Sequence, residues 1–139
     1  MSGPGPRLLL STPAFLWGPV FLVMAAIFVA SSIPDLGGLP GGMSDKSGHT
    51  LGYALLGAAL VRALAGGRLS GVTWPRAVAS VALATLYGAS DEFHQSFVPG
   101  RSPDRIDVFA DCLGASLAVA LAVAARAWGI LTRSLRSRT

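Results

Sequence analysis

The sequence predicts an all-α integral membrane protein, a single domain built as a bundle of four transmembrane helices. Composition is one reason: 52% of the 139 residues are hydrophobic and only 13% are charged, whereas soluble proteins average about 25% charged residues. The second reason is that four apolar runs follow one another along the chain, with most charges between them or at their ends. A chain of this length accommodates one domain, residues 1–139.

The first helix is predicted over about residues 13–33. No residue from Leu8 to Pro34 is charged, and about 20 helical residues cross a hydrocarbon core of about 30 Å. A cleaved signal peptide is the alternative, because Arg7 precedes the apolar run. That run is long for a signal peptide, and Ser31-Ser32-Ile33-Pro34 is a poor cleavage site. We therefore expect a retained helix.

The other three helices are predicted over about residues 44–65, 75–97 and 104–131. Their uncharged runs hold only 12 to 14 residues, too few to span a bilayer unaided. Each run is bounded on one side by an arginine that can reach the membrane interface, namely Arg62, Arg76 or Arg126. A helix that spans the bilayer needs about 20 residues counted from each arginine. The residues added to reach that length are polar, and they lie at the same end of all three helices.

The charge distribution predicts which end of the bundle faces the cytoplasm. The N-terminus, the second loop and the C-terminus hold eight basic residues and no acidic one; the first and third loops, with the adjoining helix ends, hold three basic and seven acidic residues. Basic loops stay in the cytoplasm. We therefore expect both termini to be cytoplasmic and the acidic helix ends to lie outside. Trp17, Trp74 and Trp128 fall near the inner ends, as in an aromatic belt.

Helical spacing predicts that polar side chains meet at the outer ends of the second, third and fourth helices. Residues three or four apart share a helix face, which groups two sets: Asp45, His49 and Tyr53; and Asp104, Asp107 and Asp111. On the third helix Glu92 and Gln95 share one face, while Asp91 and His94 share the next. The turn that follows presents Arg101 at the same end. Ionisable residues at membrane depth are costly, so this group is a candidate functional site.

The polar residues fall into three motifs that resemble the VanZ-like family over about residues 45–114. The motifs are Asp45-Lys46-x-x-His49-x-x-x-Tyr53, Asp91-Glu92-x-His94-Gln95-x-Phe97-x-Pro99-Gly100-Arg101 and Asp107-x-x-x-Asp111-x-x-Gly114. The resemblance implies a multi-pass protein of the bacterial cytoplasmic (inner) membrane. The family's namesake is linked to resistance to the lipoglycopeptide teicoplanin. At the position of Asp111 the family often has Asn, so a negative charge is not implied there.

We expect the outer helix ends to bind a polar or lipid-linked envelope ligand. Arg101 would meet an anionic group such as a lipid phosphate or a carboxylate, and the lipid-facing surface would accommodate acyl or prenyl chains. The expected partners are membrane lipids and either a lipid-linked envelope precursor or the lipoglycopeptide. The expected ligand-binding residues are Arg101, Glu92, Gln95, His49, Asp107, Asp111 and Tyr53.

Structural roles are the alternative for several of these residues. Asp45, Lys46 and Asp104 are expected to cap helices or to stay solvated. Glu92, Arg101 and Asp107 could form a buried salt-bridge network, although desolvation makes such networks weak stabilising devices. His49 could hydrogen-bond a carboxylate within the bundle. The single cysteine, Cys112, excludes an internal disulfide and is expected in the core.

An intramembrane hydrolase or transferase is the alternative function. It would act on a lipid-linked cell-envelope substrate, with Glu92 or Asp107 as the base and His49 as the acid partner. A proton-coupled transporter is disfavoured, because the inner half of the bundle holds no ionisable residue other than boundary arginines. Whether the protein is an enzyme is left open by the sequence.

Neither a resident metal ion nor nucleic acid is expected. Two histidines and three carboxylates have the donor chemistry for zinc or manganese, namely His49, Glu92, His94, Asp107 and Asp111, but no compact motif such as HExxH is present. The net charge of +4 comes from scattered arginines rather than from the basic stripe of a nucleic-acid interface.

Overall fold

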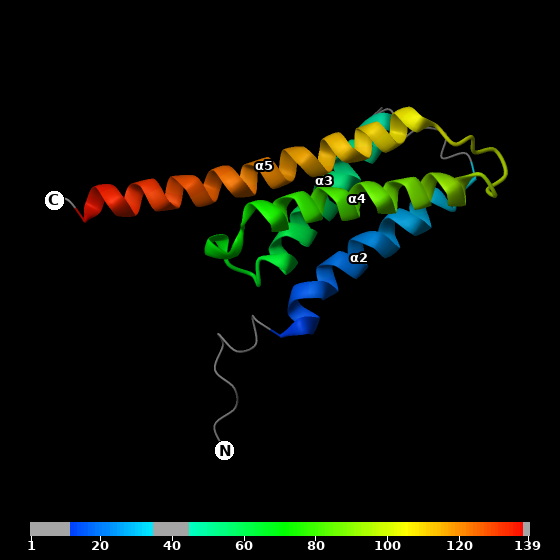
Figure 1. Ribbon diagram of the computed structural model, residues 1–139. Helices are drawn as coiled ribbons and strands as arrows, with labels where there is room; N and C mark the ends of the chain where they lie inside the picture. Colours follow the sequence, from blue (N-terminus) through cyan, green and yellow to red (C-terminus); the bar gives the residue numbers. More distant parts are fainter. Residues whose placement is uncertain (1–11, 35–44, 138–139) are drawn as a thin grey trace, which may run out of the picture.

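The computed structural model describes residues 12–34 and 45–137, which form four α-helices and one short 3-10 helix (Figure 1). The α-helices are α2 (Pro13–Ser31), α3 (Asp45–Leu64), α4 (Trp74–Gln95) and α5 (Arg105–Arg136), and η1 (Leu69–Gly71) lies between α3 and α4. The described residues contain no strand, so the fold is all-α as predicted. The helix bounds lie close to the predicted ones, except that α5 continues to Arg136 instead of ending near residue 131.

Two of the helices, α2 and α5, are long and apolar enough to cross a membrane. Their large apolar side chains point outward, with Leu22 and Leu121 each 72% exposed. Extensive exposed apolar surface is unfavourable in water and suits a lipid environment. The helices α3 and α4 do not meet the same criterion; one end of each carries polar residues. Crossing of the membrane by all four helices therefore stays a prediction.

The most extensive helix contact, between α3 and α5, includes close approaches at two glycines. A Cβ atom on Gly57 would lie 2.8 Å from the Cα atom of Ala115, and one on Gly114 would collide with the carbonyl oxygen of Thr50. Small residues at these positions let two backbones approach closely. Gly52 instead faces Ile27 of α2, where a Cβ would make ordinary contact at 3.7 Å.

The predicted boundary arginines bind backbone carbonyls at the end of the bundle opposite the polar residues. Arg62 donates to the carbonyl of Phe15 over 3.1 Å, and Arg76 donates to that of Gly71 over 2.8 Å. Arg126 donates to the carbonyl of Val72. These contacts tie helix ends and loops together. Beyond them α5 extends past the other helices (Figure 1).

Candidate functional site

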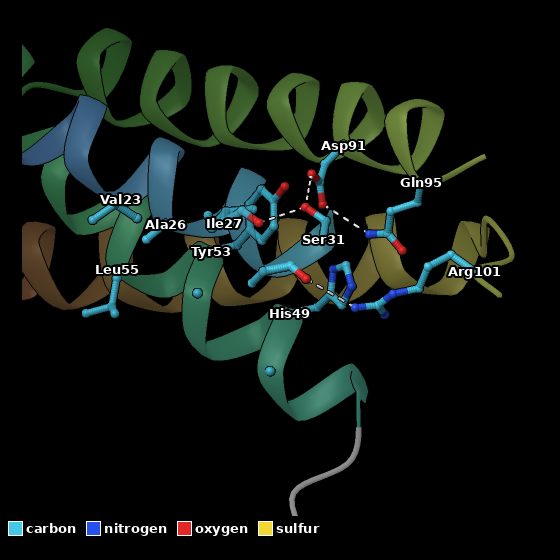
Figure 2. Close-up of a pocket in the computed structure, with 13 residues that line it drawn as sticks. Val23, Ala26, Ile27, Ser31, His49, Tyr53, Leu55, Asp91, Gln95 and Arg101 are labelled. Atoms are coloured by element: carbon cyan, nitrogen blue, oxygen red, sulfur yellow. Dashed lines mark hydrogen bonds between the residues drawn. The ribbon is translucent and has the colours of Figure 1, made fainter. Parts of the chain in front are cut away.

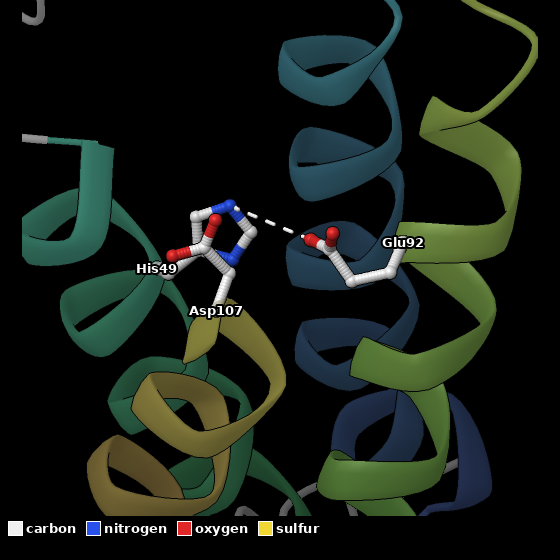
Figure 3. A group of neighbouring side chains, drawn as sticks. All are labelled: His49, Glu92 and Asp107. Atoms are coloured by element: carbon white, nitrogen blue, oxygen red, sulfur yellow. Dashed lines mark ion pairs between the residues drawn. The ribbon is translucent and has the colours of Figure 1, made fainter. Parts of the chain in front are cut away.

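The C-terminal end of α4 and the N-terminal ends of α3 and α5 bring three predicted site residues together (Figure 3). His49 lies in the first turns of α3, Glu92 in the last turn of α4 and Asp107 in the first turn of α5. One side-chain nitrogen or oxygen from each lies within 4.8 Å of the others. We call these residues, with Asp111, the polar cluster. Helical spacing along each chain segment predicts its members, and the close α3–α5 contact places them side by side.

His49 is held between two carboxylates. Its Nδ1 lies 2.9 Å from Oδ1 of Asp111, and its Nε2 lies 3.9 Å from Oε1 of Glu92. When Asp111 is ionised it only accepts hydrogen bonds, and in that state Nδ1 carries the hydrogen and donates to it. The other ring nitrogen is therefore directed towards Glu92. Asp111 is fully buried, and the side chains of His49 and Glu92 are 10% and 7% exposed.

Glu92 is fixed by two further donors. The backbone N–H of Asp104 donates to its Oε2 over 2.8 Å, which ties α4 to the start of α5. The side-chain amide of Gln95 donates to its Oε1 over 3.3 Å and to Oδ2 of Asp91 over 3.1 Å. Gln95 thus joins two buried carboxylates on the same helix. These contacts orient Glu92 towards His49.

An ion pair lies at the exposed rim of the polar cluster. The ammonium of Lys46 contacts Asp104 at 2.9 Å and Asp107 at 3.1 Å, and the lysine side chain is half exposed. Asp104 is the N-cap of α5 and accepts from the N–H of Ile106 over 2.9 Å. That N–H and the Lys46 ammonium lower the pKa of Asp104. The expected capping role of Asp104 is confirmed, whereas the side chain of Asp45 lies outside the described residues.

The next face of α4 contacts α2. The hydroxyl of Ser31 donates to Oδ1 of Asp91 over 2.6 Å. Nε2 of His94 lies 3.0 Å from the hydroxyl of Ser32, and its ring stacks on Phe28 with centroids 4.5 Å apart. His94 is therefore directed away from the polar cluster. Sequence reasoning missed the two serines, whose only signal was a polar pair at the end of an apolar run.

A pocket of about 290 Å³ adjoins the polar cluster between α2, α3 and α4 (Figure 2). One part is apolar and includes Val23, Ala26, Ile27 and Leu55. The part nearest the outer helix ends is polar and is lined by Ser31, His49, Tyr53, Asp91, Gln95 and Arg101. Four of the seven predicted ligand-binding residues therefore line the pocket, and the other three, Glu92, Asp107 and Asp111, belong to the polar cluster beside it.

Arg101 contacts the end of α2. Its Nε donates to the carbonyl of Ile33 over 3.3 Å, and its Nη2 donates to that of Ala30 over 3.4 Å. A cation is favourable at a helix C-terminus, where carbonyls point outward. Glu92 and Asp107, the two acids considered as its ion-pair partners, instead pair with His49 and Lys46. The alternative from the sequence, a buried salt-bridge network of Arg101 with Glu92 and Asp107, is therefore wrong about the partners of Arg101.

Two further residues have distinct environments. Tyr53 is 1% exposed, and its hydroxyl has no hydrogen-bond partner among the described residues. Its ring is parallel to that of His49, with centroids 6.2 Å apart. Cys112 is half-buried rather than in the core, where the sequence placed it.

Comparison with protein-family models matches the VanZ/LLP1 family over residues 43–126. No curated protein and no solved structure matches the chain. The family match covers more than half of the sequence and contains α3, α4, the polar cluster and Arg101. Together with the two apolar helices α2 and α5, it indicates a membrane protein, and the chain belongs to the VanZ/LLP1 family.

Proposed function

We propose that this protein binds an amphiphile with a polar, anionic headgroup at the outer leaflet of the bacterial inner membrane. The observation that carries the proposal is the change in the pocket from apolar walls along α2 and α3 to polar walls at the helix ends. An acyl or prenyl chain would lie against Val23, Ala26 and Leu55. A phosphate or carboxylate would lie near Arg101, since guanidinium groups pair strongly with such anions.

The pocket size fits a headgroup and the first part of a chain. Ligand pockets usually measure about 300–1,000 Å³, and this one lies at the lower limit at about 290 Å³. Ala26 and Ala30, which line it, are exposed on the surface of α2. The remainder of a long chain can therefore leave the pocket sideways and continue along the apolar surface of the protein.

Orientation in the membrane is part of the same proposal. All four α-helices would cross the bilayer, with both termini in the cytoplasm, because the basic residues gather on the side that holds the termini. The polar cluster and the pocket mouth would then face the outer surface. Lipid-linked envelope precursors and lipoglycopeptides are amphiphiles found on that side, and we propose that binding of one of them links this protein to teicoplanin resistance.

Two neighbouring alanines on α2 allow a matched test of pocket binding. Both side chains are exposed, but Ala26 lines the pocket and Ala25 does not. The full-length protein in nanodiscs would be exposed to polyprenyl phosphate, phosphatidylglycerol and teicoplanin, and bound molecules counted by native mass spectrometry. We expect Ala26→Leu to lose the bound anionic amphiphile and Ala25→Leu to keep it. Equal binding by both variants, or no retained amphiphile in the wild type, would contradict the proposal.

A hydrolase or transferase is the second candidate, favoured by the His49–Asp111 contact. A histidine oriented by a buried carboxylate is a common acid–base arrangement, and Glu92 lies on the opposite side of the ring. Incubating the purified protein with a radiolabelled polyprenyl-linked sugar separates the two functions. Time-dependent release of the sugar, lost in His49→Ala, would establish turnover; retention of intact substrate supports binding alone.

A further inference from the structure

We infer that the polar cluster is a divalent-cation site, in which His49, Glu92 and Asp107 are the ligands and Asp111 orients the histidine. This inference goes beyond amphiphile binding and does not depend on it, because only His49 of the three ligands lines the pocket, whereas Glu92 and Asp107 lie beside it. The ligand set of one imidazole and two carboxylates suits Zn²⁺ or Mn²⁺. The sequence predicts no metal, since the three ligands come from three different helices rather than from one compact motif.

Distances within the cluster are compatible with this assignment. The three donor atoms lie within 4.8 Å of one another, and Nε2 of His49 lies 3.9 Å from Oε1 of Glu92. A cation bound about 2.0–2.2 Å from each atom requires donor separations of about 3–4 Å. At the 4.8 Å limit the donor atoms need to approach by about 1–2 Å, a shift that we assign to side-chain rotation.

The hydrogen bonds around the ligands are those of a supported metal site. A metal-binding histidine usually donates its other ring N–H to a carboxylate or a carbonyl, which fixes the nitrogen that faces the metal. Asp111 accepts from Nδ1 of His49 at 2.9 Å in this way. Glu92 is likewise held by the N–H of Asp104 and by the amide of Gln95. Two of the three ligands thus have their orientation fixed by neighbours.

The charges around the cluster also favour a cation. Five carboxylates lie at this end of α4 and α5, and all but that of Asp104 are at least nine-tenths buried: Asp91, Glu92, Asp104, Asp107 and Asp111. Among the described residues, His49 and Lys46 form ion pairs with these carboxylates, and the lysine is half exposed at the rim, paired with Asp104 and Asp107. Buried carboxylates without compensating charge are strongly disfavoured. A divalent ion next to His49 would supply that charge inside the cluster.

Metal content of the full-length protein in detergent tests the site. After treatment with EDTA, the protein would be dialysed against Zn²⁺ or Mn²⁺, freed of excess ion and analysed by plasma mass spectrometry. We expect about one ion per chain, and tighter binding of Zn²⁺ than of Mn²⁺. His49→Ala, Glu92→Gln and Asp107→Asn should each abolish retention. His94→Ala is the matched control: this histidine lies at the same helix end but contacts Ser32 and Phe28, so retention should not change.

Asp111 provides a test of the orienting role. Asp111→Ala removes the acceptor and should weaken Zn²⁺ binding about 10–100-fold, the usual effect of losing such a partner. Asp111→Asn keeps an oxygen that accepts from Nδ1, so its affinity should stay within a few-fold of wild type. If the ligand variants do not fold, Co²⁺ added to the wild-type protein gives an independent readout, a visible absorption band that one equivalent of Zn²⁺ removes. A wild-type protein that retains no ion and shows no such band overturns the inference, as does equal loss of metal in His94→Ala.

Discussion

Nδ1 of His49 lies 2.9 Å from Oδ1 of Asp111, and this contact joins the outer turns of α3 and α5. Gly114, one helical turn beyond Asp111, lies directly against the backbone of Thr50, the residue that follows His49. The position of the imidazole is therefore set by how closely the two backbones approach. Small residues in the helix contact control the geometry of the polar cluster as much as the polar residues themselves.

Enlarging Gly114 should destabilise the protein. The added methyl of Gly114→Ala would collide with the carbonyl of Thr50, and overpacking of this kind costs about 1–3 kcal/mol. The same substitution at Gly129 of α5 meets no atom within 4 Å and should be neutral or stabilising by up to about 1 kcal/mol. Thermal unfolding in detergent measures both. A lower melting temperature for Gly129→Ala than for Gly114→Ala would contradict the packing argument.

Helix positions and the membership of the polar cluster were largely predictable from the sequence. Polar residues three or four apart share a helix face whatever the helix packs against, so these residues were expected to gather where three helix ends meet. The specific contact of His49 with Asp111 was not predicted. The C-terminal end of α4 at Gln95 followed from the number of residues needed to span a bilayer.

The partners of Arg101, Asp91 and His94 could not be predicted in the same way. Spacing along a helix does not specify how far that helix is rotated relative to its neighbours. The structure places α2 beside the second polar face of α4, where Ser31 and Ser32 supply hydroxyl groups. Nor does the sequence indicate that α2 and α3 leave a pocket between them, because that depends on side-chain volumes summed over both helices.

Reporter fusions test the proposed orientation. A periplasm-active reporter fused after Gly100 should be active, because the turn between α4 and α5 would lie outside. Fusions after Gly67 and at the C-terminus should be inactive, because basic residues keep those segments in the cytoplasm. A cytoplasm-active reporter at the same three positions is the control and should give the opposite pattern. Activity of the Gly67 fusion in the periplasm would invert the proposed topology.

Removing the hydroxyl of Tyr53 should separate ligand binding from stability. A buried donor without a partner is unfavourable, so Tyr53→Phe should leave the melting temperature unchanged or raise it. Because Tyr53 lines the pocket, the same change should weaken binding of a hydrogen-bonding headgroup by about 1 kcal/mol, or roughly fivefold. Tyr87 is the comparison, because its hydroxyl donates to the carbonyl of Met24 over 2.8 Å. Tyr87→Phe removes this hydrogen bond and should lower stability by about 1 kcal/mol. The expected result is that Tyr87→Phe lowers the melting temperature and Tyr53→Phe does not.

Arg101→Lys tests whether the guanidinium recognises an anion. Lysine keeps the positive charge near the C-terminus of α2, and with it the favourable interaction with the helix carbonyls, but it cannot make the two-point contact with a phosphate or carboxylate. We expect near wild-type abundance and a loss of about tenfold or more in affinity for polyprenyl phosphate, measured in nanodiscs by native mass spectrometry. Binding of a neutral polyprenol should change little. Arg105→Lys is the matched control, because Arg105 is exposed and does not line the pocket. If Arg101 only holds the end of α2, Arg101→Lys should reduce abundance or melting temperature. It should then weaken the binding of neutral and anionic amphiphiles equally. That outcome would show that Arg101 does not recognise the anion.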